Sequence, residues 1–173
     1  MGKVSCMGLI VALAFSVKTM PLAAQNESGQ VRGVEIAAAV NLKKKDVKIE
    51  GTLFVPEKVS RVRAVIVAIN WGIGGSVYQD PQFRQLVETL QSGLLLARVS
   101  NIGPTLADLP VADRVERNAA IGGAEALILL LQRLAEESGH QEVGDAPLVL
   151  WGHSAAGSFA MTFAALQPRR TIA

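Results

Sequence analysis

A serine set among small residues is the feature of this sequence that could do chemistry. The run "PLVLWGHSAAGSFA" (147–160) passes from apolar residues to Gly152, then to Ser154, then to alanines and a glycine. A serine hydroxyl is a useful nucleophile only when a base takes its proton. It must also stand exposed, and a sharp strand-to-helix turn with small neighbours exposes a side chain in this way. The pattern predicts that Ser154 is a catalytic nucleophile, with a serine that merely caps a helix as the alternative.

The segments around Ser154 alternate between strand and helix patterns. Apolar, β-rich runs predict strands at 34–40, 47–56, 62–70, 93–100 and 146–151. Helical spacing predicts helices at 80–93, 111–139 and 155–167. This order favours an α/β fold with a mostly parallel sheet and crossover helices, in which the site lies at the carboxyl ends of the strands. We therefore expect residues 25–173 to belong to a single domain.

Several local signals give the predicted helices their bounds. Asp80 is a possible cap with Pro81 at the first position, and Gly93 is the expected stop. In this helix one apolar face is predicted, made of Phe83, Leu86, Val87 and Leu90. The glycine-rich segment 71–80 is interpreted as a loop. In the segment 111–139, the pair Gly122–Gly123 indicates either a close approach to the sheet or a break.

The serine motif, the glycine-rich loop and the order of elements together resemble the α/β-hydrolase family of serine esterases. The likeness covers nearly all of residues 25–173. It implies that the backbone N–H of Ala155, directly after the nucleophile, stabilises a tetrahedral oxyanion. It also implies a second donor in "NWGIGG" (70–75), the N–H of Ile73 or Gly72. Two residues depart from the family pattern: Ala156 stands in place of the second glycine of the turn, and the loop 70–75 has no histidine.

The base that Ser154 would need is not evident in this sequence. Of the two histidines, His140 precedes the last predicted strand and so lies at its far end. His153 adjoins the serine, and we expect its side chain to point away from the cleft and to be packed. The family's order is serine, acid, histidine, but no Asp, Glu or His follows Ser154. We therefore interpret the sequence as the N-terminal part of a longer hydrolase, truncated after the helix that follows Ser154, and expect residues 25–173 alone to be inactive.

The first 24 residues have the pattern of a secretory signal. Lys3 is followed by a 14-residue uncharged, mostly apolar stretch and by small residues that allow cleavage after Ala24. The stretch is shorter than the roughly 20 residues that span a bilayer. We expect a secreted or periplasmic protein with no stable membrane insertion after cleavage. Cys6, the one cysteine, lies within this leader.

Composition and motif searches exclude several other classes of function. A net charge of +2 gives no reason to expect nucleic-acid binding. No cofactor is expected: a dinucleotide fingerprint beginning at Gly72 would require a third glycine at position 77, which is Val77, and no phosphate-loop pattern occurs. No cluster has metal-ligand spacing. We interpret Asp108 and Asp113 as loop or cap residues and Arg98 as one side of an ion pair.

Together these features predict acyl transfer to water, with Ser154 attacking a carboxylic ester. The resemblance implies a small-molecule or polymeric ester as the substrate. A peptidase on the same fold is an alternative. So is a non-catalytic binding protein that keeps the serine turn, or a short chain completed by a partner chain. The sequence makes no prediction of the oligomeric state.

Overall fold

The computed structural model describes residues 30–69, 74–103 and 108–172. The strands are β1 (Gly33–Leu42), β2 (Val47–Pro56), β3 (Val65–Ile69), β4 (Gly93–Asn101) and β5 (Leu148–Trp151). The helices are α1 (Gly74–Gln79), α2 (Pro81–Thr89), α3 (Gly123–Ser138) and α4 (Ala155–Leu166). Short 3-10 turns lie between them, at Lys43–Lys45, Val111–Asp113, Ala119–Ile121 and Gln141–Gly144. No helix of the described residues is long and apolar enough to cross a membrane.

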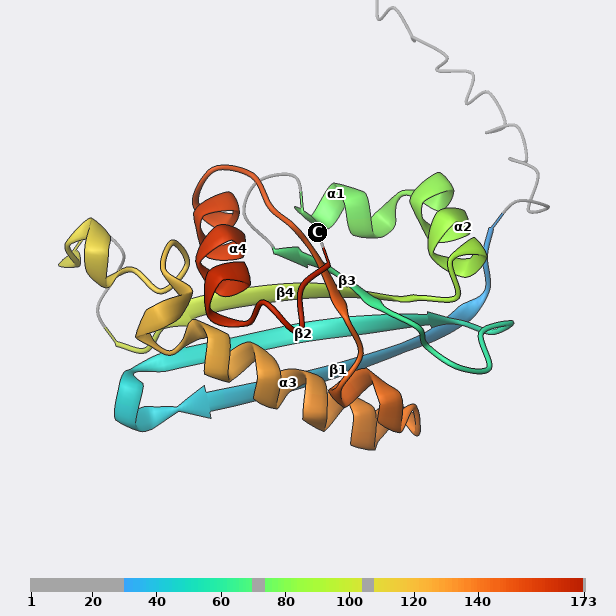
Figure 1. Ribbon diagram of the computed structural model, residues 1–173, viewed down its shortest axis with the longest axis horizontal. Coiled ribbons are helices and arrows are strands. Elements are labelled where there is room, and N and C mark those ends of the chain that lie inside the picture. Colours follow the sequence, from blue (N-terminus) through green and yellow to red (C-terminus); the bar gives the residue numbers. More distant parts are fainter. Residues whose placement is uncertain (1–29, 70–73, 104–107, 173) are drawn as a thin grey trace, which may run out of the picture.

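The five strands form one sheet in the order β1-β2-β4-β3-β5 (Figure 1). β2 is antiparallel to both β1 and β4, whereas β3 is parallel to β4 and to β5. All the strands except β2 therefore run in the same direction, and their carboxyl ends meet at one edge of the sheet. This arrangement confirms the predicted mostly parallel sheet with crossover helices.

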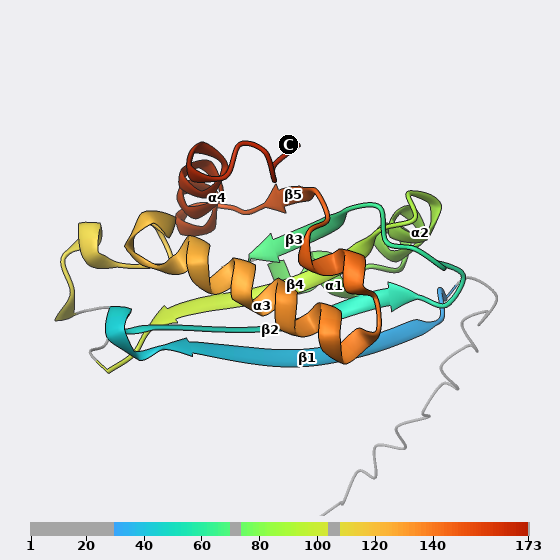
Figure 2. The same cartoon turned by 60° about the horizontal axis from the view of Figure 1, so that its bottom comes forward.

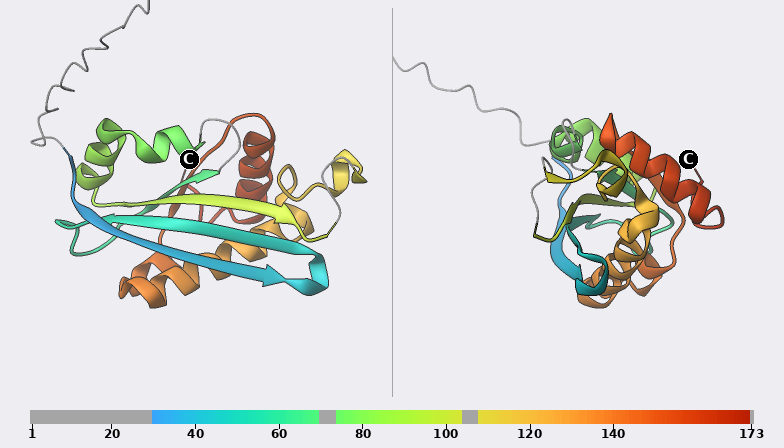
Figure 3. Two further views of the ribbon diagram at one scale, coloured as in Figure 1. Left: turned by 180° about the vertical axis from the view of Figure 1, so that it is seen from behind. Right: turned by 90° about the vertical axis from the view of Figure 1, so that its left-hand side faces the viewer.

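The two faces of the sheet carry separate apolar cores because side chains alternate along each strand. On one face, Val67 and Leu95 belong to a large cluster that includes Leu130 of α3 and Phe159 of α4. On the other face, Ile66 belongs to a smaller cluster completed from α1 and α2, with the buried residues Phe54, Tyr78, Val87 and Leu94. The end view in Figure 3 shows the same three layers, with α1 and α2 on one side of the sheet and α3 and α4 on the other.

The prediction of one long helix over 111–139 is wrong in its first half. The segment forms two 3-10 turns, and α3 begins only at Gly123. Gly122 has a φ of 118°, which breaks the helix at this point. At Gly123 a Cβ would lie 2.5 Å from the ring of Phe159, so this glycine permits close packing of α3 against α4. A Cβ on Gly122 would lie 3.1 Å from Val47 of β2, so the pair also approaches the sheet closely, as predicted. The predicted helix end at Gly139 is confirmed, with a φ of 76° at that residue.

The region between β3 and β4 also departs from expectation. The second half of the predicted loop 71–80 is helix α1, which buries Tyr78 against the sheet. The Asp80 cap is confirmed, since its carboxylate accepts the N–H groups of Gln82 and Phe83 at 2.8 and 3.0 Å. Gly93 does not end α2 but begins β4. The predicted apolar face is only half correct: Val87 is buried and Phe83 partly so, whereas two leucines are exposed, Leu86 and Leu90.

After α4 the chain returns to the outer edge of β5. Thr171 forms a parallel bridge with Leu148, in which the Leu148 N–H donates to Arg170 and the Ile172 N–H donates to Leu148. The helix α4 is thus a crossover between β5 and an adjacent parallel segment. This continues the predicted alternation of strands and helices.

Candidate active site

Ser154 occupies the turn between β5 and α4 with an unusual backbone conformation. Its φ of 58° and ψ of −118° lie outside the regions that L-residues normally adopt. Two other non-glycine residues of the described part have positive φ, Asp46 and Gln91, and both lie in turns between elements. Asp46 has the common left-handed conformation, with ψ of 38°, whereas Ser154 does not. The surrounding structure therefore holds Ser154 in a strained geometry.

Close packing of α4 against the preceding strand end enforces this turn. A Cβ on Gly152 would lie 2.6 Å from the carbonyl carbon and oxygen of Ala156 and 2.9 Å from its Cβ. A side chain at position 152 would thus collide with the first turn of α4. Ala156 itself is fully buried. The alanine that departs from the family pattern is accommodated because Gly152 leaves room for its methyl group.

The side chain of Ser154 does not act as a helix cap. Although Ser154 stands at the N-cap position of α4, its hydroxyl makes no capping hydrogen bond. The residue is exposed. The alternative interpretation of Ser154 as a serine that merely caps a helix is therefore wrong, and its hydroxyl is accessible from solvent.

The N–H of Ala155, the predicted oxyanion donor, lies at the first position of α4, directly after Ser154. The N–H groups of Ala156 and Ser158 donate to the carbonyls of His153 and Ser154, each at 3.2 Å. Ala155 begins α4, and within the described residues its N–H has no backbone acceptor. The positive end of the helix dipole adds to its attraction for a negative oxygen next to Ser154.

The second predicted donor, Gly72 or Ile73, lies outside the described residues. In the described part of β3, Ala68 pairs with Trp151 of β5. Ile69, the last residue of β3, therefore lies at the same edge of the sheet as the turn that carries Ser154.

The two histidines lie at opposite ends of β5. His140 is at the amino end of β5, where its Nδ1 is 3.0 Å from the carboxylate of Glu142, so it is far from the turn at the other end of the strand. His153 is exposed, so the prediction that it is packed is wrong. Neither histidine is hydrogen-bonded to Ser154 in the structure.

The other charged candidates have structural contacts. Arg98 faces Glu50 across the β2–β4 ladder. The pKa of the Glu50 carboxyl is lowered mainly by the hydrogen bond from Lys48, against the opposing effect of burial, and the charges of Lys48 and Arg98 add to this. The ion pair of Glu50 is with Lys48, at 2.6 Å, so the interpretation of Arg98 as one side of an ion pair is not borne out among the described residues. Asp113 is exposed and its carbonyl accepts a hydrogen bond from Asn101, whereas Asp108 is an exposed loop residue. No group of three His, Cys, Asp or Glu that could hold a metal ion occurs in the described part.

One buried acid was not singled out from the sequence. Glu116 is 2% exposed, and its Oε2 has no hydrogen-bond partner among the residues described. Its neighbour Val115 donates to the side chain of Asn101, so Glu116 lies near the carboxyl end of β4. No motif could have identified it, because a glutamate in a loop is ordinarily solvated.

Comparisons with known proteins agree in fold type but not in sequence. No family model matches the sequence, and no curated protein matches it. Among solved structures, the chain is similar to a brefeldin A esterase described as a bacterial homologue of human hormone-sensitive lipase. The identity is 16%, the TM-score is 0.44, and the match covers 92% of this chain and 39% of that one.

Two further structures are similar to a comparable degree. For an S-formylglutathione hydrolase from Agrobacterium tumefaciens the identity is 16% and the TM-score 0.47, covering 80% of this chain and 55% of that one. For a cold-adapted esterase from an Arctic intertidal metagenomic library the identity is 16% and the TM-score 0.41, and the match covers 78% of this chain and 56% of that one. The chain thus spans 39% to 56% of the length of these proteins, and the likeness concerns the fold.

Proposed function

We propose that this chain carries the nucleophile of a serine hydrolase that cleaves carboxylic esters, of small molecules or of polymers, through Ser154. The observation that carries this proposal is the conformation of Ser154. A strained, exposed serine without a capping bond, placed between a strand and a helix, is costly for stability and is typical of a nucleophile elbow.

The chemistry then follows from the atoms around Ser154. Its Oγ attacks the ester carbonyl carbon while the base takes the hydroxyl proton. The carbonyl oxygen becomes an oxyanion and accepts the N–H of Ala155, with Ile73 or Gly72 as the second donor. The base returns the proton to the departing alcohol, and water releases the acid from the acyl-serine by the same steps.

We propose that the base is a histidine, oriented by an acid, and that both come from sequence outside residues 1–173. This part of the proposal is supported by the position of His140 at the opposite end of β5 and by the lack of any Asp, Glu or His in residues 155–173. We also propose that residues 1–24, outside the described part, direct export to the periplasm or the medium. N-terminal sequencing of the protein purified from its source checks cleavage after Ala24.

The nucleophile is tested by comparing Ser154→Ala with Ser158→Ala in the complete protein. Ser158 is also an exposed serine at the start of α4, so it is a matched control. We expect Ser154→Ala to lower kcat/KM for p-nitrophenyl butyrate by about 10³-fold or more, and to abolish labelling by a fluorophosphonate. The Ser158→Ala control should retain both the esterase activity and the labelling. Cleavage of a peptide substrate but not of esters would indicate the peptidase alternative, and a wild-type protein with neither activity nor labelling would indicate a binding protein.

A further inference from the structure

The strand β1 ends the sheet with an unprotected edge. No strand of the described residues pairs with its outer side. It pairs with β2 without interruption from Gly33 to Leu42, so no bulge twists it away. Between Ile36 and Val40 it contains no charged residue and no proline. Bulges, charges and prolines are the usual means by which soluble proteins prevent pairing at a sheet edge. In β1 the one charged residue is Glu35, near its start, where it forms an ion pair with Arg84, and the central part of the edge lacks all three.

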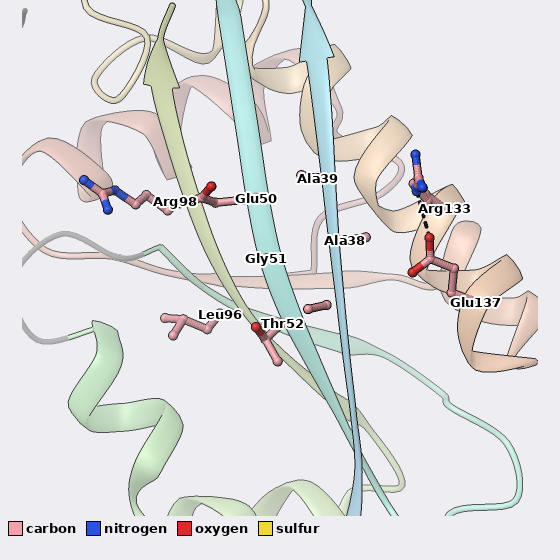
Figure 4. A pocket seen from close by; sticks show the side chains of 10 residues that line it. Ala38, Ala39, Glu50, Gly51, Thr52, Leu96, Arg98, Arg133 and Glu137 are labelled. Carbon is pink, nitrogen blue, oxygen red and sulfur yellow. Dashed lines mark hydrogen bonds and ion pairs between the residues drawn. The ribbon is translucent and has the colours of Figure 1, made fainter.

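A hollow of about 640 Å³ lies alongside this edge. Its lining includes Ala37, Ala38 and Ala39, whose side chains are small. Figure 4 shows Glu50 and Arg98 of the sheet on one side of β1, and Arg133 and Glu137 of α3 on the other. Because Glu50 and Arg98 belong to β2 and β4, the hollow extends over these inner strands as well as along β1, and β1 therefore borders open space.

The sequence of β1 is complementary to itself in the antiparallel direction. Residues 34–42 read "VEIAAAVNL" and are nearly symmetrical about Ala38. If Ala38 faces its own copy, each residue meets one of similar character, in the pairs Val34 with Leu42, Glu35 with Asn41, Ile36 with Val40, and Ala37 with Ala39. Glu35 then faces an amide rather than another carboxylate, which avoids a like-charge pair. A two-fold axis requires such reciprocal contacts.

We propose that β1 pairs antiparallel with β1 of a second copy of this chain, centred on Ala38, so that the two sheets continue into each other. The register aligns residues of the same parity, so backbone groups that point outward on one strand meet outward-pointing groups on the other. The main chain supplies hydrogen bonds along the whole strand, as in other cases of strand addition.

The charges on α3 fit the same two-fold axis. Figure 2 shows α3 running across β1 and β2. Arg133 and Glu137 form an ion pair at 2.8 Å, and the Arg133 side chain is 58% exposed. A two-fold axis perpendicular to the sheet keeps both α3 helices on one face and makes them antiparallel. It then brings Arg133 toward the partner's Glu137, and the reciprocal pair forms as well, which adds charge complementarity to the strand pairing.

Single cysteines test the register directly, in the intact protein with Cys6→Ser as the background. Residues directly opposite in an antiparallel pair have Cα atoms about 4.5 or 5.5 Å apart, within reach of a disulfide. We expect Ala38→Cys to form a disulfide dimer under mild oxidation. Neither Ala37→Cys nor Ala39→Cys should do so alone, but a mixture of the two should. Equal cross-linking of all three single variants would overturn the proposed register.

Light scattering on the wild-type protein tests the dimer itself, and a mass of one chain at all concentrations would overturn the proposal. Ala37→Lys/Ala39→Lys places a lysine opposite a lysine in both copies. We expect this to raise the dimer dissociation constant by about tenfold or more. Gln79→Lys/Gln82→Lys adds the same charge at exposed sites on α1 and α2 and should leave it unchanged. Arg133→Glu should also weaken the dimer, and Arg133→Glu/Glu137→Arg should restore it.

Discussion

At the scale of single residues, the strained backbone conformation of Ser154 is the observation on which its proposed catalytic role rests. A φ of 58° with a ψ of −118° is the mirror image of extended backbone. Glycine adopts this region freely, whereas any residue with a Cβ is strained there by about 1–3 kcal/mol. Serine at position 154 is therefore less stable than glycine in this conformation, and the proposed function supplies a reason for serine, because the reaction needs its hydroxyl group.

The strain predicts an order of stability among variants at position 154. Ser154→Ala removes the hydroxyl but keeps the Cβ, whereas Ser154→Gly removes both. We expect the glycine variant to have a free energy of unfolding about 1 kcal/mol above that of the alanine variant, after allowing for the greater freedom of glycine in the unfolded chain. Urea unfolding of the two variants measures this difference. An alanine variant as stable as the glycine variant would show that the turn is not strained, and would remove the main support for the nucleophile.

At the scale of secondary-structure elements, the packing of α3 against α4 holds the serine turn in place. Gly123 contacts Phe159, which is fully buried between the helices. The first turn of α4, which contains Ala155 and Ala156, is fixed in this way against the rest of the fold. The position of Ala155, the proposed oxyanion donor, thus depends on a glycine more than thirty positions earlier in the chain.

This packing predicts a specific loss of stability on adding one methyl group. A Cβ at position 123 would lie 2.5 Å from the Phe159 ring and 3.1 Å from Val115, and neither can move into open space. We expect Gly123→Ala to reduce the free energy of unfolding by about 1–3 kcal/mol, although alanine is the better helix former. Gly123→Ala/Phe159→Leu should cost less than the sum of the two single changes, as measured in a double-mutant cycle. Additive effects would contradict the proposed contact.

Comparing the predicted with the observed elements shows which of them local sequence signals determine. The strands and the Asp80 cap were predictable because β-rich runs and Asp-Pro pairs act locally. The pair Gly122–Gly123 indicated a break or a close approach to the sheet without deciding between them. The contact of Gly123 with Phe159 and the helix α1 were not predictable, because they depend on packing between distant segments, which no local pattern contains. At the site, glycine and serine spacing predicted the turn at Ser154. The backbone conformation of Ser154, on which the proposed nucleophile rests, depends on the close approach of Gly152 to Ala156, which is evident only in the three-dimensional structure.

At the scale of the whole molecule, Glu142 joins the segments that lead into two neighbouring parallel strands. It lies in the turn before β5, and its carboxylate accepts the N–H of Val62, ahead of β3, at 2.8 Å. Burial would raise the pKa of this carboxyl, but the N–H groups of Val62 and of Glu142 itself, with His140, outweigh burial, and the pKa falls below its ordinary value. The charged form is therefore the one that favours the folded state.

This lowered pKa predicts how the stability of the fold depends on pH. Because the pKa is lower in the folded state, the contribution of Glu142 is complete at neutral pH and is lost as the pH falls from 4.5 through the folded value. We expect Glu142→Gln to reduce the free energy of unfolding by about 1 kcal/mol at pH 7, where the charged hydrogen bond is lost, and by progressively less in acid. Glu136→Gln, at an exposed position on α3, is the control and should show no such change. Urea unfolding of the three proteins between pH 3 and pH 7 measures the effect, and a difference between wild type and Glu142→Gln that grows toward low pH would show that folding does not lower the pKa of Glu142.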